Sequence, residues 1–262
     1  MKYYIVDAFT DQLFKGNQAG VCLLDEWLDS TLMQRIAAEN KLAETAFVVP
    51  RGTHYDLRWF TPDVEFDLCG HATLASAFVI SNFVDENAET IRFETMSGTL
   101  TVTKRGELYE MDFPARPPEP IAITPLMEQA LGVPVLEAHR SRDLMLLVES
   151  EEEVRNLSPD MALLKQIPEA AIGLIVTAKG TSCDFVSRYF LPNANEEAPE
   201  DPVTGSAHCT LIPFWRERLG KDDMLARQLS KRGGTLLCQY RGERVNISGH
   251  AVLYLEGTIR TA

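Results

Sequence analysis

The sequence predicts an α+β fold built from two similar lobes, each a buried helix surrounded by strands. The first observation behind this prediction is an internal repeat, because residues 44–73 and 171–208 carry the same signals in the same order. The second is that each copy runs into a segment long enough for a central helix, the almost entirely apolar 70–83 and its counterpart 205–219. The matching signals are Gly52-Thr53 and Gly180-Thr181, Asp56-Leu57 and Asp184-Phe185, Arg58-Trp59-Phe60-Thr61-Pro62 and Arg188-Tyr189-Phe190-Leu191-Pro192, Asp67 and Asp201, and Gly70-His71-Ala72 and Gly205-Ser206-Ala207.

A proline-rich segment marks the boundary between the lobes. Four of the seven residues from Pro114 to Pro120 are prolines, so this segment is expected to continue neither a helix nor a sheet. We therefore expect an N-terminal lobe over residues 1–116 and a C-terminal lobe over residues 117–250. A last strand, within residues 251–262, is expected to return to the N-terminal lobe and complete it.

The N-terminal lobe is predicted from alternating and apolar runs separated by turn residues. Ser30 is the candidate cap of a helix in which Leu32, Ile36 and Ala37 fall on one face. A turn at Arg105-Gly106 indicates a hairpin. The predicted elements are strands at 3–9 and 20–24, a helix at 31–40, strands at 45–49 and 55–60, the buried helix at 70–83, and hairpin strands at 99–104 and 108–113.

The C-terminal lobe repeats this plan. Its acidic run from Glu149 to Glu153 is typical of a solvated helix start and is assigned no function. The predicted elements are a helix at 125–131, strands at 144–148, 172–178 and 184–190, the central helix at 205–219, and strands at 245–248 and 252–259.

The overall charge argues against a nucleic acid as partner. The 262 residues carry a formal net charge of −13, so the basic stripe that binds a phosphate backbone is missing. No run approaches the roughly 18 apolar residues that span a bilayer, and the first residues lack the features of a signal peptide. We expect a cytoplasmic protein that acts on a small molecule, with no nucleic acid and no membrane as partner.

Motifs for cofactors and metals are missing from the sequence as well. It contains no G-x-G-x-x-G or Walker motif, so nicotinamide, flavin and ATP have no support. The five cysteines are scattered without the paired spacing of a zinc site, and most are expected to be buried thiols. We therefore expect no organic cofactor and no metal ion.

The segments that lead into the two central helices are the expected place of the chemistry. Gly70 and Gly205 begin these helices, where free N–H groups and the helix dipole attract an anion. Two such helix starts predict a carboxylate held in a cleft between the lobes. His71 and Ser206 follow the glycines at equivalent places. Burial at a helix start predicts that the His71 imidazole is neutral near pH 7.

One acidic residue breaks the symmetry of the repeat. Glu44 precedes the apolar strand 45–49, and the alignment of the two copies places Ala171 opposite it. A carboxyl group at the mouth of a buried segment is suited to proton transfer, whereas a solvated strand start is the ordinary alternative. The broken symmetry favours proton transfer. Asp201 leads into the second central helix, where capping is its ordinary role.

Several of these segments resemble the signatures of one family. In order and spacing, over nearly the whole chain, they are similar to the PhzF family of phenazine-biosynthesis-protein-like isomerases. The resemblance implies a diaminopimelate epimerase-like fold, with two pseudo-symmetric lobes that each wrap a curved mixed β-sheet around a central helix, and it implies a homodimer. The segments are Gly16-Asn17-Gln18-Ala19-Gly20-Val21, Ala43-Glu44-Thr45-Ala46-Phe47-Val48, Arg58-Trp59-Phe60-Thr61-Pro62, Glu65-Phe66-Asp67-Leu68-Cys69-Gly70-His71-Ala72-Thr73-Leu74-Ala75 and Asp201-Pro202-Val203-Thr204-Gly205-Ser206-Ala207-His208.

The resemblance implies catalytic roles for four residues. Glu44 matches the family's catalytic glutamate, which in the phenazine enzyme moves a proton between carbons of a dihydro-hydroxyanthranilate ring without metal or organic cofactor. His71, Asp201 and Ser206 match polar residues that assist this glutamate.

It also implies substrate-binding positions. Asn17, Gly70 and Gly205 match residues that line the ligand cleft, and Cys69 matches one catalytic cysteine of the related epimerases. Gln18 departs from the pattern, since the family commonly has proline there. The implied substrate is a small-molecule carboxylate.

Three functions are therefore open from the sequence. The first is a cofactor-independent isomerase in which Glu44 shifts a proton within a small carboxylate. The second is an amino-acid racemase or epimerase that uses Cys69, for which a second thiol in the other lobe is not visible. The third is a carboxylate-binding protein without catalysis. The substrate is not specified, and selectivity is expected from side chains such as those of Glu196 to Glu200.

Overall fold

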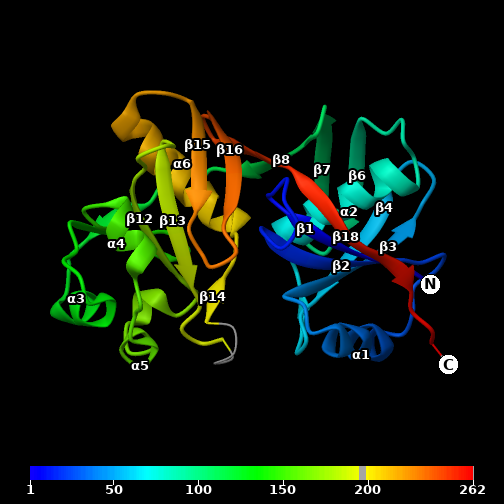
Figure 1. The fold of residues 1–262 in the computed structure, drawn as a ribbon, viewed down its shortest axis with the longest axis horizontal. Helices are drawn as coiled ribbons and strands as arrows, with labels where there is room; N and C mark the ends of the chain where they lie inside the picture. Colours follow the sequence, from blue (N-terminus) through cyan, green and yellow to red (C-terminus); the bar gives the residue numbers. More distant parts are fainter. Residues whose placement is uncertain (195–198, 262) are drawn as a thin grey trace. The chain divides into compact units, whose positions relative to one another are not determined.

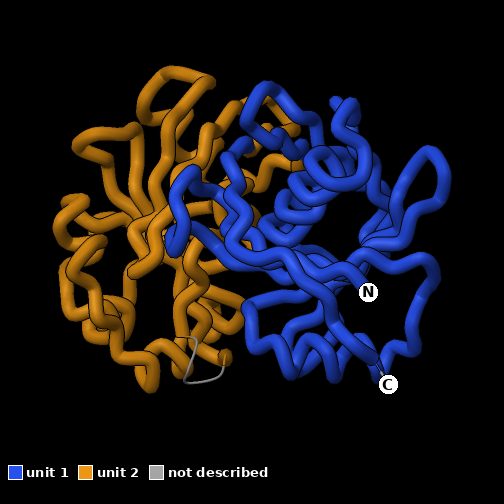
Figure 2. The backbone as a smooth tube through the Cα atoms, turned by 45° about the vertical axis from the view of Figure 1, so that its right-hand side comes forward, with its two compact units in different colours: residues 1–112, 248–262 blue, residues 113–247 orange. Residues whose placement is uncertain are grey.

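The computed structural model describes residues 1–194 and 199–261 (Figure 1). The chain divides into two compact units (Figure 2). Unit 1 is Met1–Asp112 with Ser248–Ala262, and unit 2 is Phe113–Ile247. The sequence places the two boundaries a few residues later, at 116/117 and at 250/251.

Unit 1 consists of a mixed sheet and one long buried helix, α2. Its elements are β1 Lys2–Ala8, β2 Asn17–Leu23, α1 Ser30–Asn40, β3 Glu44–Pro50, β4 Tyr55–Phe60, β5 Glu65–Phe66, α2 Gly70–Phe83, β6 Thr90–Thr95, β7 Gly98–Arg105, β8 Leu108–Pro114 and β18 Ala251–Thr258. The hydrogen-bonded strands follow the order β18-β1-β2-β3-β4-β6-β7-β8, with β2–β3 and β4–β6 parallel and the other pairs antiparallel. α2 consists mainly of small and apolar residues, and it contacts β1, β2, β3, β7 and β18.

The cap of α1 differs from the prediction. The sequence predicts Ser30, but the cap is Asp29, whose carboxylate accepts a hydrogen bond from the backbone N–H of Thr31 at 2.9 Å. Ser30 is the first helical residue, and its hydroxyl accepts a hydrogen bond from Arg58 at 2.9 Å. An aspartate one residue earlier competes for the same role, because Asp and Ser cap helices about equally well.

Unit 2 is built from a second mixed sheet and the long helix α6. Its elements are β9 Glu119–Ile121, α3 Pro125–Leu131, β10 Glu137–Arg140, β11 Leu144–Leu147, α4 Glu151–Asn156, α5 Met161–Leu164, the 3₁₀ turn η1 Pro168–Ala170, β12 Leu174–Lys179, β13 Phe185–Phe190, β14 Glu200–Asp201, α6 Gly205–Leu219, β15 Asp223–Gln228, β16 Gly234–Arg241 and β17 Arg244–Gly249. Its hydrogen-bonded strands include the series β9-β10-β11-β12-β13-β15-β16.

A proline inside α6 connects this helix to the proline-rich segment. Pro213 has no N–H, so the carbonyl of Cys209, four residues earlier, loses its usual helical partner. That carbonyl instead accepts a hydrogen bond from the backbone N–H of Arg116 at 2.9 Å. This hydrogen bond therefore holds the proline-rich segment against α6 at the beginning of unit 2.

The prediction that 114–120 contains no sheet is wrong. Pro114 ends β8, and Pro120 is the central residue of β9, where it lies opposite His139 of β10. Within the described part of the chain, β9 pairs with β10 alone, so it lies at an edge, where a residue without an N–H is tolerated.

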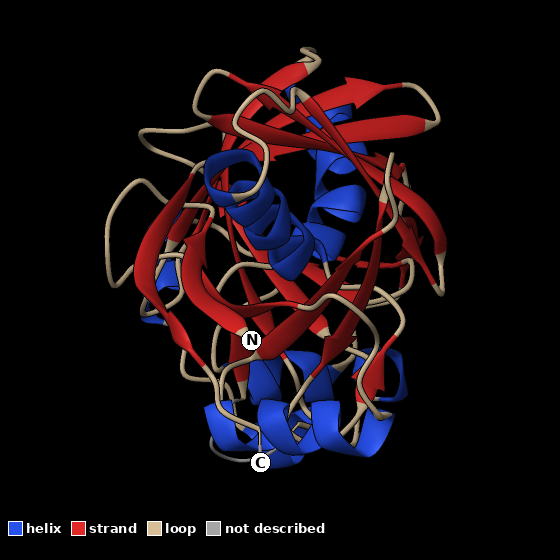
Figure 3. Cartoon of the chain, turned by 90° about the vertical axis from the view of Figure 1, so that its right-hand side faces the viewer, coloured by secondary structure: helices blue, strands red, loops and turns tan. Residues whose placement is uncertain are grey.

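The two units repeat one strand plan. The series β10-β11-β12-β13-β15-β16 corresponds to β1-β2-β3-β4-β6-β7, and the parallel pairs fall at the same two places. β9 lies antiparallel beside β10 as β18 lies beside β1. The fold is therefore α+β, with a central helix wrapped by a mixed sheet in each unit, which confirms the predicted class. Figure 3 shows the long helices surrounded by strands.

Strand register corrects the partner of Glu44 in the repeat. Thr45 in unit 1 and Leu174 in unit 2 occupy equivalent positions, because each pairs with the last residue of the next strand. Glu44 directly precedes Thr45 and Gly173 directly precedes Leu174, so Gly173 is the equivalent of Glu44. The alignment of the two sequence copies instead placed Ala171 opposite Glu44. The loops between the paired strands differ in length in the two copies, and this difference shifts the alignment. The pairs that set this register are Thr45 with Phe60 and Leu174 with Phe190.

Among the described residues, no helix is both long and apolar enough to cross a membrane.

Candidate active site

The two central helices begin without a side-chain cap. Cys69 precedes α2 and Thr204 precedes α6, and neither side chain accepts a bond from the first turn. The helices α1, α3, α4 and α5 all have such a cap. The first N–H groups of an α-helix have no partner within the helix, so both central helices offer donors to an anion.

Glu44 lies beside His71 at the start of α2. Glu44 is the first residue of β3, and its Oε2 is 3.1 Å from Nε2 of His71. The two side chains are 17% and 7% exposed. The distance is that of an ion pair, but the two atoms are not aligned for a hydrogen bond, and neither has another hydrogen-bond partner among the described residues. This carboxylate oxygen is therefore shielded from water and still able to accept a proton.

The other nitrogen of His71 faces two more predicted residues. Nδ2 of Asn17 lies 3.2 Å from Nδ1 of His71, and Sγ of Cys69 lies 3.5 Å from the same nitrogen. Asn17 begins β2, and parallel pairing of β2 with β3 brings it close to Glu44. Unit 1 thus places Asn17, Glu44, Cys69 and His71 in one cluster at Gly70, the first residue of α2.

The ionisation of His71 differs from the prediction. Burial opposes its charged form, but Cys69 and Glu44 on either side of the ring outweigh burial and raise the pKa of His71 well above its usual value. Prediction from the sequence weighed burial and the helix dipole alone, so it missed these two neighbours. Burial also raises the pKa of Cys69, which keeps the sulfur as a thiol at neutral pH. The neighbours of the ring therefore favour protonation of His71, against the effect of its burial.

The same three residues are the natural candidates for holding a metal. Ligand atoms of Glu44, Cys69 and His71 lie within 4.8 Å of one another. Glu44 approaches Nε2, however, whereas Cys69 approaches Nδ1, on the opposite side of the ring. An ion bound to one of these nitrogens would leave the other nitrogen to its present contact.

Ser206, the second residue of α6, belongs to a different cluster in unit 2. Its hydroxyl accepts a hydrogen bond from Nη2 of Arg142 at 3.1 Å. The same nitrogen donates to Tyr189 Oη at 3.3 Å, and Nε of Arg142 donates to Asp143 at 3.1 Å. Gly205, the first residue of α6, lies beside this cluster.

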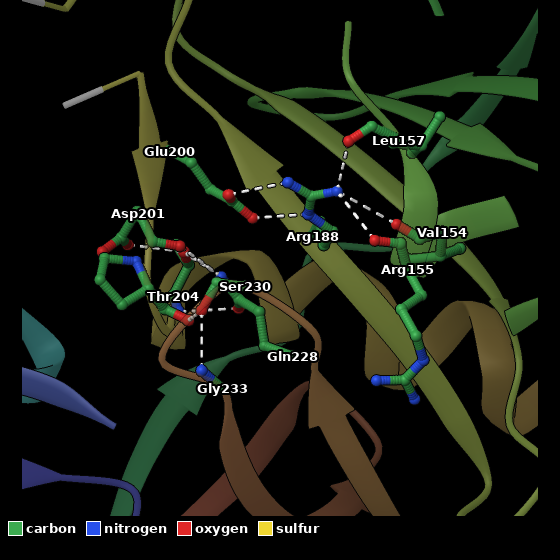
Figure 4. A network of polar contacts seen from close by, with 11 residues as sticks. Val154, Arg155, Leu157, Arg188, Glu200, Asp201, Thr204, Gln228, Ser230 and Gly233 are labelled. Carbon is green, nitrogen blue, oxygen red and sulfur yellow. Dashed lines mark hydrogen bonds and ion pairs between the residues drawn. The ribbon is translucent and has the colours of Figure 1, made fainter. Parts of the chain in front are cut away.

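Asp201 binds the turn that precedes α6. Its Oδ2 accepts a hydrogen bond from Thr204 Oγ1 at 2.6 Å, and its carbonyl accepts one from Gln228 Nε2 at 2.7 Å (Figure 4). Thr204 Oγ1 also accepts a bond from Gln228, which explains why Thr204 does not cap the helix. Asp201 therefore stabilises the turn, and its predicted catalytic role stays a prediction.

Only part of the predicted specificity segment can be placed. Residues 196–198 lie outside the described residues. Glu200 forms an ion pair with Arg188, with Nε and Oε1 2.7 Å apart (Figure 4). That pair holds the end of β14 against the middle of β13, so Glu200 has a structural partner.

Three residues of the Ser206 cluster were missed from the sequence. Tyr189 was noticed only as a member of the repeat. Arg142 and Asp143 stand directly before the apolar strand β11, and a charged pair at the start of a buried strand is the signal that marks them.

Comparison with known proteins agrees with the fold. The chain matches the family of phenazine biosynthesis-like proteins, PhzC-PhzF, over residues 6–257. A Pseudomonas aeruginosa protein named as an uncharacterized isomerase is 50% identical over 97% of this chain and 96% of its own length. The crystal structure of a putative PhzC/PhzF phenazine biosynthesis protein from Clostridium difficile is 53% identical, with a TM-score of 0.94 over 100% of both chains.

A more distant structure shares the fold alone. The hydroxyproline epimerase of Agrobacterium vitis is 11% identical, with a TM-score of 0.64 over 98% of this chain and 91% of its own. The epimerase-like class predicted from the sequence is thus confirmed. The protein belongs to the PhzC-PhzF family of phenazine biosynthesis-like proteins and is an isomerase.

Proposed function

We propose that the protein is a cofactor-independent isomerase in which Glu44 moves a proton between two carbons of a small carboxylate. Glu44 takes the proton from an acidic C–H, and the electron pair left on carbon spreads into the conjugated system of the substrate. The carboxyl group then returns the proton to another carbon. No atom is gained or lost, as an isomerisation requires.

The observation that carries this proposal is the state of the Glu44 carboxylate. Its Oε2 is buried and has no aligned hydrogen-bond donor among the described residues. A structural carboxylate at such a depth normally accepts two or three hydrogen bonds. An oxygen left without them is available to a substrate proton, and β3 holds it rigidly beside α2.

His71 supports the negative charge of the reacting substrate. Glu44 and Cys69 raise the pKa of His71 and so favour its protonated form, and the ring lies 3.1 Å from the carboxylate. A cation at this position stabilises an enolate-like intermediate as charge leaves Glu44 and develops on the substrate. Removing the imidazole therefore slows the reaction even though Glu44 remains.

The uncapped start of α2 is suited to the negative charge that develops on the reacting substrate. The first-turn N–H groups at Gly70 and His71 have no acceptor within the helix, and Cys69 supplies no competing cap. Backbone donors stabilise an anion without a cationic side chain, which matters in a chain of net charge −13.

Solvent exchange tests the role of Glu44. In D₂O the wild-type protein should incorporate deuterium into a dihydro-hydroxyanthranilate, or into a carboxylate recovered from the purified protein by mass spectrometry. Glu44→Gln should lower this rate by about 10² to 10⁴, the usual contribution of a positioned acid or base. Glu107→Gln, at an exposed residue in the β7–β8 turn of the same unit, is the matched control and should exchange at the wild-type rate.

The competing mechanism predicts the opposite pattern. A racemase that relies on Cys69 would lose exchange in Cys69→Ser and keep it in Glu44→Gln. Undiminished exchange in folded Glu44→Gln therefore excludes Glu44 as the base.

A further inference from the structure

A buried ion pair in unit 2 holds one arginine at the start of α6. Asp143 is fully buried, and its carboxylate accepts hydrogen bonds from Nε of Arg142 at 3.1 Å and from the hydroxyl of Tyr189 at 2.8 Å. Tyr189 is itself buried. Removing a charged group from water is costly, so Asp143 requires both of these partners.

This arrangement leaves part of the guanidinium free. Nε and Nη2 of Arg142 bind Asp143, Tyr189 and Ser206, whereas Nη1 has no hydrogen-bond partner among the described residues. The Arg142 side chain is 34% exposed, although Asp143 beneath it is 1% exposed. The guanidinium is therefore fixed on its buried side and open on the other.

The repeat shows what Tyr189 replaces. Gly173 is the register equivalent of Glu44, and a Cβ at Gly173 would stand 2.0 Å from the Tyr189 hydroxyl. The space in which unit 1 carries its acidic side chain is thus filled in unit 2 by a tyrosine that binds Asp143 and Arg142. At equivalent positions of the repeat, unit 1 therefore carries the carboxylate of Glu44, whereas unit 2 carries a tyrosine that holds the guanidinium of Arg142.

The surroundings of Arg142 suit a planar anion. Ser206, its hydrogen-bond partner, lies in the first turn of α6, where Thr204 provides no cap because its hydroxyl donates to Asp201. A carboxylate here would meet N–H donors of both the guanidinium and the helix. Asp143 balances the charge of Arg142, so directed hydrogen bonds contribute more than net charge, and these favour the flat, two-oxygen geometry of a carboxylate.

We propose that Arg142 is a specificity-determining residue that binds the carboxylate of the substrate at the start of α6, with Asp143 and Tyr189 as its positioning residues. The inference rests on the proposed function only in taking the substrate to be a carboxylate. It does not depend on which residue transfers the proton.

Binding of a non-reacting pair of ligands tests it. Anthranilate carries a ring carboxylate, and anthranilamide has nearly the same shape without the charge. Titration calorimetry on the wild-type protein should show anthranilate binding roughly tenfold or more tighter than anthranilamide. Arg142→Gln would leave Asp143 buried without a cation, so the double variant Arg142→Gln with Asp143→Asn is the informative one.

The double variant should lose the preference for anthranilate and keep its affinity for anthranilamide. Arg142→Lys should retain part of the preference, since the charge remains but the fork geometry is lost. Tyr189→Phe should reduce the preference several-fold through a less well positioned guanidinium. Arg140→Gln, which removes an exposed arginine of β10, is the matched control and should behave as wild type.

Two results would overturn the proposal. One is a wild-type protein that does not bind anthranilate in preference to the amide, and the other is a folded double variant that keeps the preference. Because anthranilate does not react, neither result bears on Glu44, whose role is decided by deuterium exchange alone.

Discussion

At the scale of single residues, the pKa values of the two histidines near the starts of the central helices are shifted in opposite directions. His71 lies between Glu44 and Cys69, and its pKa is raised well above the usual value. Burial lowers the pKa of His208 to about 4, and its Nδ1 contacts the carbonyl of Thr204 at 2.8 Å. Both imidazoles are buried, so the neighbours decide the charge of each ring.

His208 should make the protein sensitive to mild acid. An unfolded histidine takes up its proton near pH 6.5, whereas folded His208 resists protonation down to about pH 4. Its contribution to the free energy of unfolding is full above pH 6.5 and is lost as the pH falls toward 4, by roughly 3 kcal/mol in total. Urea unfolding at pH 7, 6 and 5 should show this loss in wild type and a flatter profile in His208→Gln. His54→Gln, at a more exposed histidine, should retain the wild-type slope, and a His208→Gln profile as steep as wild type would contradict the assignment.

The sequence predicted the residues of unit 1 better than those of unit 2. Asn17, Glu44, Cys69 and His71 lie in short motifs, and the structure brings all four together. Arg142 escaped notice because its importance comes from contacts with distant parts of the chain. Arg142 and Asp143 are adjacent in the sequence, but the contacts of Arg142 with Tyr189 and Ser206 leave no trace in the local sequence.

At the scale of elements, helices were easier to predict than strands. The bounds of α2, α3 and α6 agree with the sequence, since glycine or proline marks each start and an apolar run continues from it. The strands β6, β10, β15 and β16 were missed. Their charged and polar residues interrupt the alternation, and only pairing with neighbouring strands reveals them.

The start of β12 depends on a residue without a side chain. A Cβ on Gly173 would lie 2.0 Å from the hydroxyl and 2.3 Å from Cζ of Tyr189, which is held by Asp143 and Arg142. Gly173→Ala should therefore lower the free energy of unfolding by about 1 to 3 kcal/mol, the usual cost of overpacking. At the control position Gly257, a Cβ meets only Leu255, at 3.5 Å, and alanine should change stability by less than about 0.5 kcal/mol. Chemical denaturation of the two variants gives the comparison, and equal stabilities would show that Tyr189 moves aside at little cost.

At the scale of the whole molecule, unit 1 is assembled from both ends of the sequence. Residues 248–262 belong to the same compact unit as residues 1–112. β18 pairs with β1 along its length, and β1 in turn pairs with β2, whose first residue is Asn17. Residues 113–247, which form unit 2, therefore lie in the sequence between the two segments of unit 1.

Removing β18 should disturb unit 1 as far as the cluster of Asn17, Glu44, Cys69 and His71. A chain ending at His250 loses every β18–β1 hydrogen bond, and β1 becomes an exposed edge strand. Amides of β1 and β2 should then exchange with solvent much faster than in the full chain. Without β18, β1 is held by β2 alone, so fewer hydrogen bonds must break for the two strands to open locally. A chain ending at Thr258 keeps β18 and loses the terminal bonds between Met1 and Ile259, so it is the matched control and should retain protection in β2. Hydrogen exchange read by mass spectrometry separates the two cases. If the shorter chain protects β2 as well as the control does, the last strand is dispensable for holding Asn17 next to His71.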